Sequence, residues 1–111
     1  MQPKLTARLW VQAALRRCDL AGIAMVVVRR GDADAGAILV KLNQRDLGCT
    51  VFSQMRTADG RLAWMRGTGE TPVSEEEADA YVARQLRYDD DLWVLEVDDR
   101  AGRLPFDDAV L

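Results

Sequence analysis

The stretch Leu92–Asp98 constrains the fold more than any other part of the sequence. It reads Leu-Trp-Val-Leu-Glu-Val-Asp, a composition typical of a β-strand. The segment before it, Ser74–Tyr88, predicts a helix, because Ser74 and Glu77 form a capping box and apolar residues recur at helical spacing. A helix that leads into a strand acts as a crossover, so this strand must return to a sheet that earlier strands have begun.

The segments before this crossover supply one helix and four strands. The helix is expected at 6–19, with Thr6 as its cap and Gly22 just past its end. The strands are expected at 23–30, 37–43, 49–54 and 61–66. Short turns rich in Gly and Asp separate them, which favours hairpins. The first strand is apolar on both faces, so we expect it to have a neighbour on each side, and we place the last strand against it.

The prediction is therefore one α+β domain over residues 1–111 with the element order α-β-β-β-β-α-β. Its sheet is five-stranded and mostly antiparallel, with the strand order 4-3-2-1-5, and two helices pack on it. The last strand should run antiparallel to the first.

The absence of histidine excludes the most kinds of chemistry. Of 111 residues none is His, so Ser-His-Asp and Cys-His catalytic units and His-bearing zinc sites are impossible within one chain. We expect no cofactor and no metal site. Cys18 and Cys49 fit no zinc or redox motif, and we expect two free, partly buried thiols. The alternative is a reactive nucleophile, for which Cys18 would lie at the wrong end of its helix.

Charge and hydropathy also limit the setting of the protein. The net charge of -3 argues against a strongly electrostatic nucleic-acid binder. The longest apolar run, 21–28, is far shorter than the ~20 residues that span a bilayer. Lys4 and Arg8 are not followed by the apolar segment of a secretory signal. We therefore expect a cytoplasmic protein that does not enter membranes.

Three polar residues form the candidate ligand-binding site. Lys41 and Asn43 share one face of the second strand, and Glu96 lies on the corresponding face of the last strand. The predicted order separates these two strands by one other strand. A lysine and a glutamate beside an asparagine are suited to a small polar ligand or to acid-base chemistry. The alternative is a structural or surface ion pair.

Two other charged sets have weaker functional interpretations. A nucleic-acid surface would use four arginines, Arg16, Arg17, Arg29 and Arg30, with Lys41 and Arg45 nearby. The carboxylates of Asp89–Asp91 and of Asp98 and Asp99 are the type that Mg²⁺ or Ca²⁺ prefers. The two acidic groups lie at opposite ends of the last strand, roughly 20 Å apart, too far to share an ion. Solvated turns are the better interpretation.

The last strand has two different faces. Trp93 belongs to the inward row with Leu95 and Val97, so we expect it to be buried beneath a helix. If both helices cover that face, the other exposes an apolar patch. The patch consists of Leu39, Leu92 and Val94, with either Met25 and Val27 or Val26 and Val28. A second copy packed on this patch would form a homodimer through the sheet face. Helices on opposite faces would instead give a self-sufficient monomer.

The leading functional hypothesis is a non-enzymatic protein-interaction module that works as a homodimer. The second is a small-ligand-binding protein or minor enzyme that uses Lys41, Asn43 and Glu96. A weaker third is nucleic-acid binding through the arginines.

Three segments resemble one known family. They are Leu15–Cys18, Ala35–Asn43 and Leu86–Val97. Together they resemble the bacterial DUF1491 family of small uncharacterised proteins, from about Leu5 to Asp107. The segment 53–71 contributes nothing to the resemblance. The resemblance to this family implies a small stand-alone bacterial protein and brings no known activity, cofactor or catalytic residue.

Overall fold

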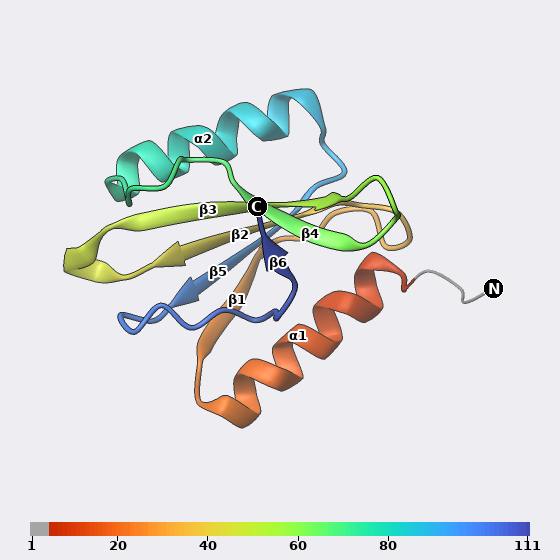
Figure 1. Ribbon diagram of the computed structural model, residues 1–111, viewed down its shortest axis with the longest axis horizontal. Coiled ribbons are helices and arrows are strands. Elements are labelled where there is room, and N and C mark those ends of the chain that lie inside the picture. Colours follow the sequence, from red (N-terminus) through yellow and green to blue (C-terminus); the bar gives the residue numbers. More distant parts are fainter. Residues whose placement is uncertain (1–4) are drawn as a thin grey trace.

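The computed structural model describes residues 5–111, in which two α-helices enclose a six-stranded sheet (Figure 1). The helices are α1 (Ala7–Ala21) and α2 (Glu75–Tyr88). The strands in chain order are β1 (Ala24–Arg29), β2 (Ile38–Asn43), β3 (Cys49–Arg56), β4 (Leu62–Arg66), β5 (Trp93–Asp98) and β6 (Ala109–Val110). A short 3-10 helix, η1 (Arg45–Leu47), joins β2 to β3. Among residues 5–111 no helix is both long and apolar enough to cross a membrane.

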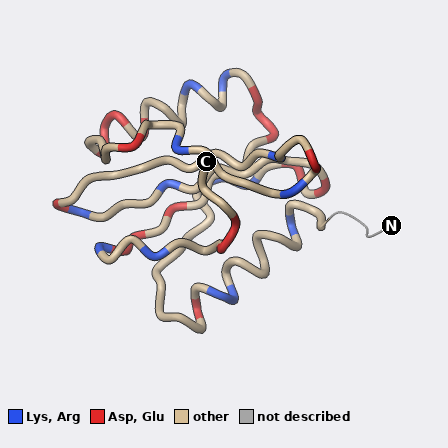
Figure 2. Tube along the Cα trace, in the orientation of Figure 1, with Lys and Arg blue, Asp and Glu red and all other residues tan. Residues whose placement is uncertain are grey.

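Both helices begin at the residues that the sequence predicts. The Thr6 hydroxyl accepts a hydrogen bond from the Leu9 N–H at 3.3 Å, and α1 ends at Gly22, whose φ of +70° suits glycine. The Ser74 hydroxyl accepts from the Glu77 N–H at 3.1 Å. Acidic residues occupy the first turn of α2, opposite in sign to the helix dipole there (Figure 2).

The strand order is β1-β5-β2-β3-β4-β6, so the sheet is mixed and has six strands. The last long strand does run antiparallel to the first, with Ala24 opposite Asp98, which confirms that predicted pairing. The predicted order 4-3-2-1-5 is wrong, and so is the hairpin between the first two strands. β5 lies between β1 and β2 and runs parallel to β2.

The connection 30–37 explains why the first two strands are not neighbours. The Asp32 N–H donates to the Asp91 carbonyl at 2.9 Å, so this segment passes over the start of β5. Gly31 lies so close to it that an added Cβ would come within 2.1 Å of the Asp91 carbonyl oxygen. The same segment reaches α1, where the Arg8 N–H donates to the Ala33 carbonyl. A connection that spans one strand width leaves room for β5, which buries four of its six residues in the centre of the sheet.

The C-terminal tail adds a short strand that the sequence analysis describes only as extended. β6 pairs in parallel with β4, and the Leu111 N–H donates to the Trp64 carbonyl at 2.8 Å. Before β6, the Phe106 ring stacks on the Trp64 ring with centroids 4.1 Å apart. The tail therefore closes the core next to β4.

The two helices lie on opposite faces of the sheet, which forms the central layer (Figure 1). On the α1 side, Trp93 is 3% exposed and packs with Leu95 and Val97, which confirms the inward row. The side chains packed on the α2 side include Leu39, Val51, Ala78 and Leu92.

This arrangement corrects the expectation of one helix layer. Leu39, Leu92 and Val94 are 2%, 7% and 3% exposed, so this central part of the predicted patch is buried within one chain, whereas Val26 and Val28 on β1 are each 59% exposed. The centre of the sheet face is therefore not available as the surface of a homodimer. β1 is also an edge strand, whereas the sequence analysis gave it a neighbour on each side.

Candidate functional site

Lys41 and Glu96 face each other across two neighbouring parallel strands. Their Cα atoms are register partners in β2 and β5, and Lys41 Nζ lies 3.1 Å from Glu96 Oε1. The sequence analysis expected a strand between them. The insertion of β5 beside β2 therefore brings the predicted pair into direct contact.

Helix α2 adds two carboxylates to this pair. Lys41 Nζ lies 2.8 Å from Glu75 Oε2 and 2.7 Å from Asp79 Oδ1. Glu75 and Asp79 are one helical turn apart, so both reach the sheet from the same side of α2. Asn43 Nδ2 donates to the same Glu75 oxygen at 3.1 Å. The three predicted residues thus form one cluster with Glu75 and Asp79, called here the Lys41 cluster.

Glu75 and Asp79 are not among the site residues predicted from the sequence, although a signal for them exists. They lie four residues apart on a helix whose only fully buried residue is Ala78. Residues that flank the buried stripe of a helix lie at the rim of its contact with the sheet, where their side chains can reach a charged group on a strand. The missing information was which strand lies there.

The Lys41 ammonium is saturated with partners. The side chain is 6% exposed, and its three N–H groups meet three carboxylates. Burial alone would lower the pKa of Lys41, but hydrogen bonds to Asp79, Glu75 and Glu96 outweigh burial and raise the pKa well above its usual value. Lys41 therefore stays protonated near neutral pH and does not act as a general base there.

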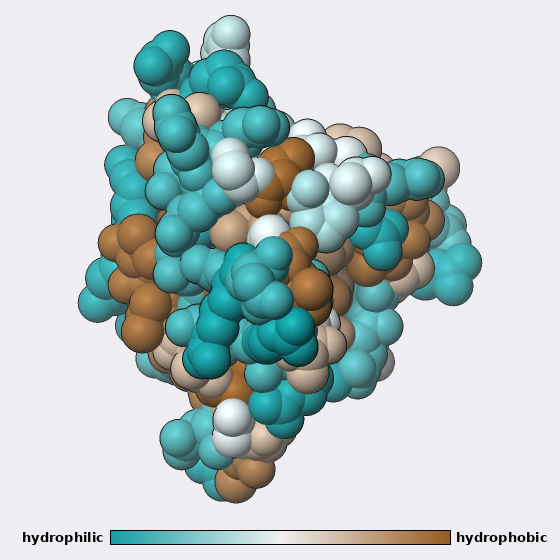
Figure 3. All heavy atoms as spheres, turned by 90° about the vertical axis from the view of Figure 1, so that its left-hand side faces the viewer, coloured by the Kyte–Doolittle hydropathy of each residue, from teal (hydrophilic) through white to brown (hydrophobic). Residues whose placement is uncertain are grey.

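The carboxylates of the cluster remain partly open to solvent. The side chains of Glu75, Asp79 and Glu96 are 56%, 60% and 30% exposed. Three carboxylates surround one ammonium, which leaves an excess of negative charge at the N-terminal end of α2. Figure 3 faces this end of the molecule, where hydrophilic surface surrounds separate apolar patches.

The structure does not gather the four candidate arginines. Arg16 and Arg17 lie near the end of α1, whereas Arg29 and Arg30 lie at the far end of β1, about 17 Å along the strand. Arg29 donates to the carbonyls of Asp90 and Leu92, at 2.7 and 3.0 Å.

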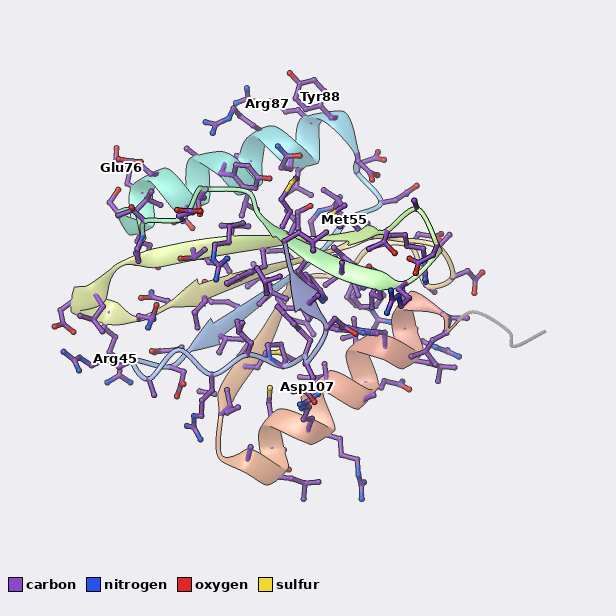
Figure 4. All side chains as sticks on the ribbon, in the orientation of Figure 1. Arg45, Met55, Glu76, Arg87, Tyr88 and Asp107 are labelled. Carbon is purple, nitrogen blue, oxygen red and sulfur yellow. The ribbon has the colours of Figure 1, made fainter. Side chains whose placement is uncertain are left out.

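Two of the other arginines are also engaged. The Arg30 guanidinium lies over the Trp93 ring, 5.7 Å from its centroid. Arg17 forms an ion pair with Asp107, which points toward α1 in Figure 4. These contacts hold the chain's own segments together.

The acidic turns and the cysteines lie where the sequence predicts. The carboxylates of Asp89–Asp91 come within 4.8 Å of one another on an exposed turn, and Asp98 and Asp99 follow at the other end of β5. Cys18 and Cys49 are free, and each is 1% exposed. Burial raises the pKa of both thiols.

A groove of about 570 Å³ lies between the N-terminal end of α1 and the β3–β4 hairpin. Trp10, Met55 and Leu62 line it, together with Asp108. The Asp108 carboxylate accepts a hydrogen bond from Trp64 Nε1 at 3.1 Å, so it already has a partner. The groove is separate from the Lys41 cluster, and none of the predicted site residues lines it.

The outer strand β1 carries the most prominent exposed apolar surface of the sheet. Val26 and Val28 are each 59% exposed, and Ala24 beside them is also exposed. Helix α2 packs on β3 and β2, so it does not reach this strand. We call the exposed surface of Ala24, Val26 and Val28 the edge surface.

Comparisons with known proteins agree with the resemblance noted in the sequence. A family profile described as "Protein of unknown function (DUF1491)" matches residues 5–107. A crystal structure of a DUF1491 family protein from Caulobacter crescentus CB15 is 39% identical, with a TM-score of 0.86 over 97% of this chain and 100% of that one. An NMR structure of a DUF1491 family protein from the same organism gives 39% identity and a TM-score of 0.85, over 99% of both chains.

A more distant relative has the same fold. The solution structure of protein Atu0922 from A. tumefaciens is 26% identical, with a TM-score of 0.72 over 96% of this chain and 97% of that one. No curated protein matches the sequence. The profile covers nearly the whole chain, and the chain therefore belongs to the DUF1491 family of proteins of unknown function.

Proposed function

We propose that this protein is a non-enzymatic interaction module that works in the cytoplasm as a homodimer. The observation that carries the proposal is the edge surface, on which Val26 and Val28 are each 59% exposed. Large apolar side chains that are exposed together on one element commonly mark a contact surface. Binding to another protein chain is the role that this surface favours.

The state of the reactive groups supports binding over catalysis. Lys41 is protonated and saturated with carboxylates, and both cysteines are buried with raised pKa values. The chain contains no histidine. Acid-base or nucleophilic catalysis needs a group that is accessible and has a pKa near the working pH.

Two further features support a cytoplasmic protein that does not bind nucleic acid. Cys18 packs on the α1 side of the sheet and Cys49 on the α2 side, and both thiols are free, which favours a reducing compartment. The four candidate arginines form two separate pairs, so we expect no nucleic-acid binding.

Light scattering coupled to size exclusion tests the homodimer. We expect a mass near twice 12.4 kDa at high micromolar concentration, which falls toward 12.4 kDa on dilution. A mass of 12.4 kDa at every concentration would contradict the homodimer.

The second candidate function is the binding of a small cationic ligand at the Lys41 cluster. The excess of carboxylate over ammonium favours it, because Glu75 and Asp79 keep oxygens open to solvent. A diamine such as putrescine, titrated into isotopically labelled protein, should shift the amide signals of α2 and of Asn43. The variant Asp79→Asn should weaken this binding, and Glu76→Gln is the matched control because Glu76 points away from the sheet (Figure 4). Equal shifts in both variants would mean non-specific binding.

A further inference from the structure

β1 is an edge strand whose first five residues, Ala24–Val28, carry no charge and no proline. It hydrogen-bonds to β5 on one side, and its other edge faces outward. The run Ala24–Val28 consists only of Ala, Met and Val. Natural edge strands normally carry a charge or a proline in the strand, because unpaired backbone groups invite another chain. This edge is therefore suited to pairing.

The regular part of the strand is short and well defined. The register to β5 is continuous from Ala24 to Val27, and an irregularity follows before Arg29. A bulge of this kind ends regular pairing and twists the strand. Arg29 and Arg30 mark the same end with positive charge. The outer edge thus offers the four residues Ala24–Val27 in regular register, and Val28 lies at the irregularity that ends it.

We propose that β1 pairs antiparallel with β1 of a second copy of this chain, around a two-fold axis that passes at Val26. This inference rests on the proposed homodimer and assigns its interface. The two sheets then join edge to edge into one continuous sheet. In this register Val26 lies opposite Val26 of the second copy, and Ala24 lies opposite Val28.

Symmetry restricts the choice of register. A two-fold axis normal to the sheet keeps each side chain on its own face, so residues that lie opposite each other must occupy equivalent faces. Only an axis that passes at a residue, and not between two residues, satisfies this condition. An axis at Val26 covers both exposed valines with apolar partners, which is the reason for placing it there.

The distribution of charge favours a second copy as the occupant. Arg29 and Arg30 lie at one end of β1, whereas Asp19 precedes the other end; Asp98, the register partner of Ala24, already pairs with Arg45 at 3.0 Å. In an antiparallel pair the basic end of each strand approaches the acidic end of the other. The surface is thus complementary to itself in charge as well as in hydropathy.

Charge substitution on the edge tests the interface. Val26→Lys places two ammonium groups opposite each other at the axis, and we expect the dissociation constant of the homodimer to rise at least about tenfold. The matched control is Met65→Lys, because Met65 is 48% exposed on β4, which three strands separate from β1. Both positions are exposed, so circular dichroism should show an intact fold in both variants.

Cysteine trapping tests the register. Val26→Cys should give a disulfide-linked dimer under mild oxidation, since residues opposite each other in antiparallel strands lie within bonding reach. Val28→Cys should not, because the two copies of residue 28 are offset by about 13 Å along the strands. The native Cys18 and Cys49 are 1% exposed, so wild-type protein should give no linked dimer.

The outcomes separate this inference from the proposed homodimer. A dimer that persists in Val26→Lys overturns the β1 interface but leaves the homodimer standing. Linkage through residue 28 instead of 26 overturns the register and its axis. A wild-type protein that is monomeric at every concentration overturns both the homodimer and this interface, and it leaves β1 to a different protein partner.

Discussion

Lys41 and Glu96 are register partners on the parallel strands β2 and β5, and their charged atoms lie 3.1 Å apart. Glu75 and Asp79 complete the surroundings of the ammonium from helix α2, at 2.8 and 2.7 Å. The cluster therefore ties the N-terminal half of α2 to two strands. A buried cation with open carboxylates is an asymmetric arrangement, because only the lysine depends on its partners for solvation.

Because of this asymmetry, removing the lysine and removing the carboxylates should have unequal effects on the free energy of unfolding. Lys41→Met leaves three carboxylates that can turn to water, so we expect a loss of about 1 kcal/mol or less in the free energy of unfolding. The triple variant Glu75→Gln, Asp79→Asn, Glu96→Gln leaves the ammonium buried without an anion. We expect it to lose about 3 kcal/mol, because an uncompensated buried charge is costly. Urea unfolding measures both values.

A combined variant is the control for this prediction. Adding Lys41→Met to the triple variant removes the stranded cation and should recover most of the lost stability. If the triple variant is no less stable than Lys41→Met alone, the ammonium is solvated by other groups and the cluster does not hold α2.

Asp99 should contribute to stability in a pH-dependent way. Its carboxylate accepts from the Arg103 backbone N–H at 2.7 Å and from the Arg103 guanidinium at 2.9 Å. The Arg103 side chain and backbone hold the pKa of Asp99 below its usual value. A carboxyl whose pKa is lower in the folded state stabilises the fold above its unfolded pKa, and this stabilisation is lost as the pH falls through the folded pKa.

The check is the urea midpoint as a function of pH. In the wild type, the urea concentration at the midpoint should decrease as the pH is lowered below about 4. Asp99→Asn should be less stable at pH 7, and its midpoint should decrease less at low pH. Arg103→Met should have a similar effect because it removes the partner. If the midpoint of Asp99→Asn decreased with pH as steeply as that of the wild type, other carboxyls would be responsible for the loss of stability in acid.

Trp93 should be a major contributor to stability on the α1 side of the sheet. It is 3% exposed, and its Nε1 donates to the Asp32 carbonyl at 2.8 Å. Trp93→Ala should therefore cost about 3–5 kcal/mol in the free energy of unfolding. The matched control is Tyr88→Ala, since Tyr88 is 87% exposed and points outward from the last turn of α2 (Figure 4). A loss below about 1 kcal/mol for Trp93→Ala would contradict the observed packing.

The two thiols should be unreactive in the folded protein. Cys18 and Cys49 are each 1% exposed, and burial raises the pKa of both. A disulfide reagent such as Ellman's should react slowly with native protein and quickly with two thiols per chain in guanidinium chloride. Recovery near zero from denatured, non-reduced protein would mean that the cysteines are oxidised.

Much of the local structure could be predicted from the sequence because local rules determine it. The caps at Thr6 and Ser74 depend on a side chain and an N–H three residues away, and both are confirmed. The alternation in β5 correctly assigned Trp93 to a buried row beneath a helix and Glu96 to the opposite face, but not which helix covers which face. Lys41, Asn43 and Glu96 were identified as one group for the same reason, and they do share the α2 face of the sheet.

The strand order depended on contacts that no local pattern records. The sequence of β1 is apolar on both faces, which fits a central strand and also an edge strand that another chain covers. The alternatives differ in the path of the connection 30–37, which is held by the Asp32 N–H to Asp91 carbonyl bond between segments far apart in the chain. Glu75 and Asp79 remained hidden for the same reason, because their role exists only once α2 lies on β2.

The sequence by itself therefore determined the two α-helices and five long strands, the helix caps, the buried row of β5 and the exclusion of histidine chemistry. Periodicity, caps and composition act over a few residues and can be read directly. Only the tertiary structure decided that β5 separates β1 from β2, that the helices cover opposite faces and that β1 is left at the edge. These features arise because β5 is buried in the centre of the sheet while the connection 30–37 passes over it. Contacts between distant parts of the chain decide this arrangement, so it is a property of the whole fold.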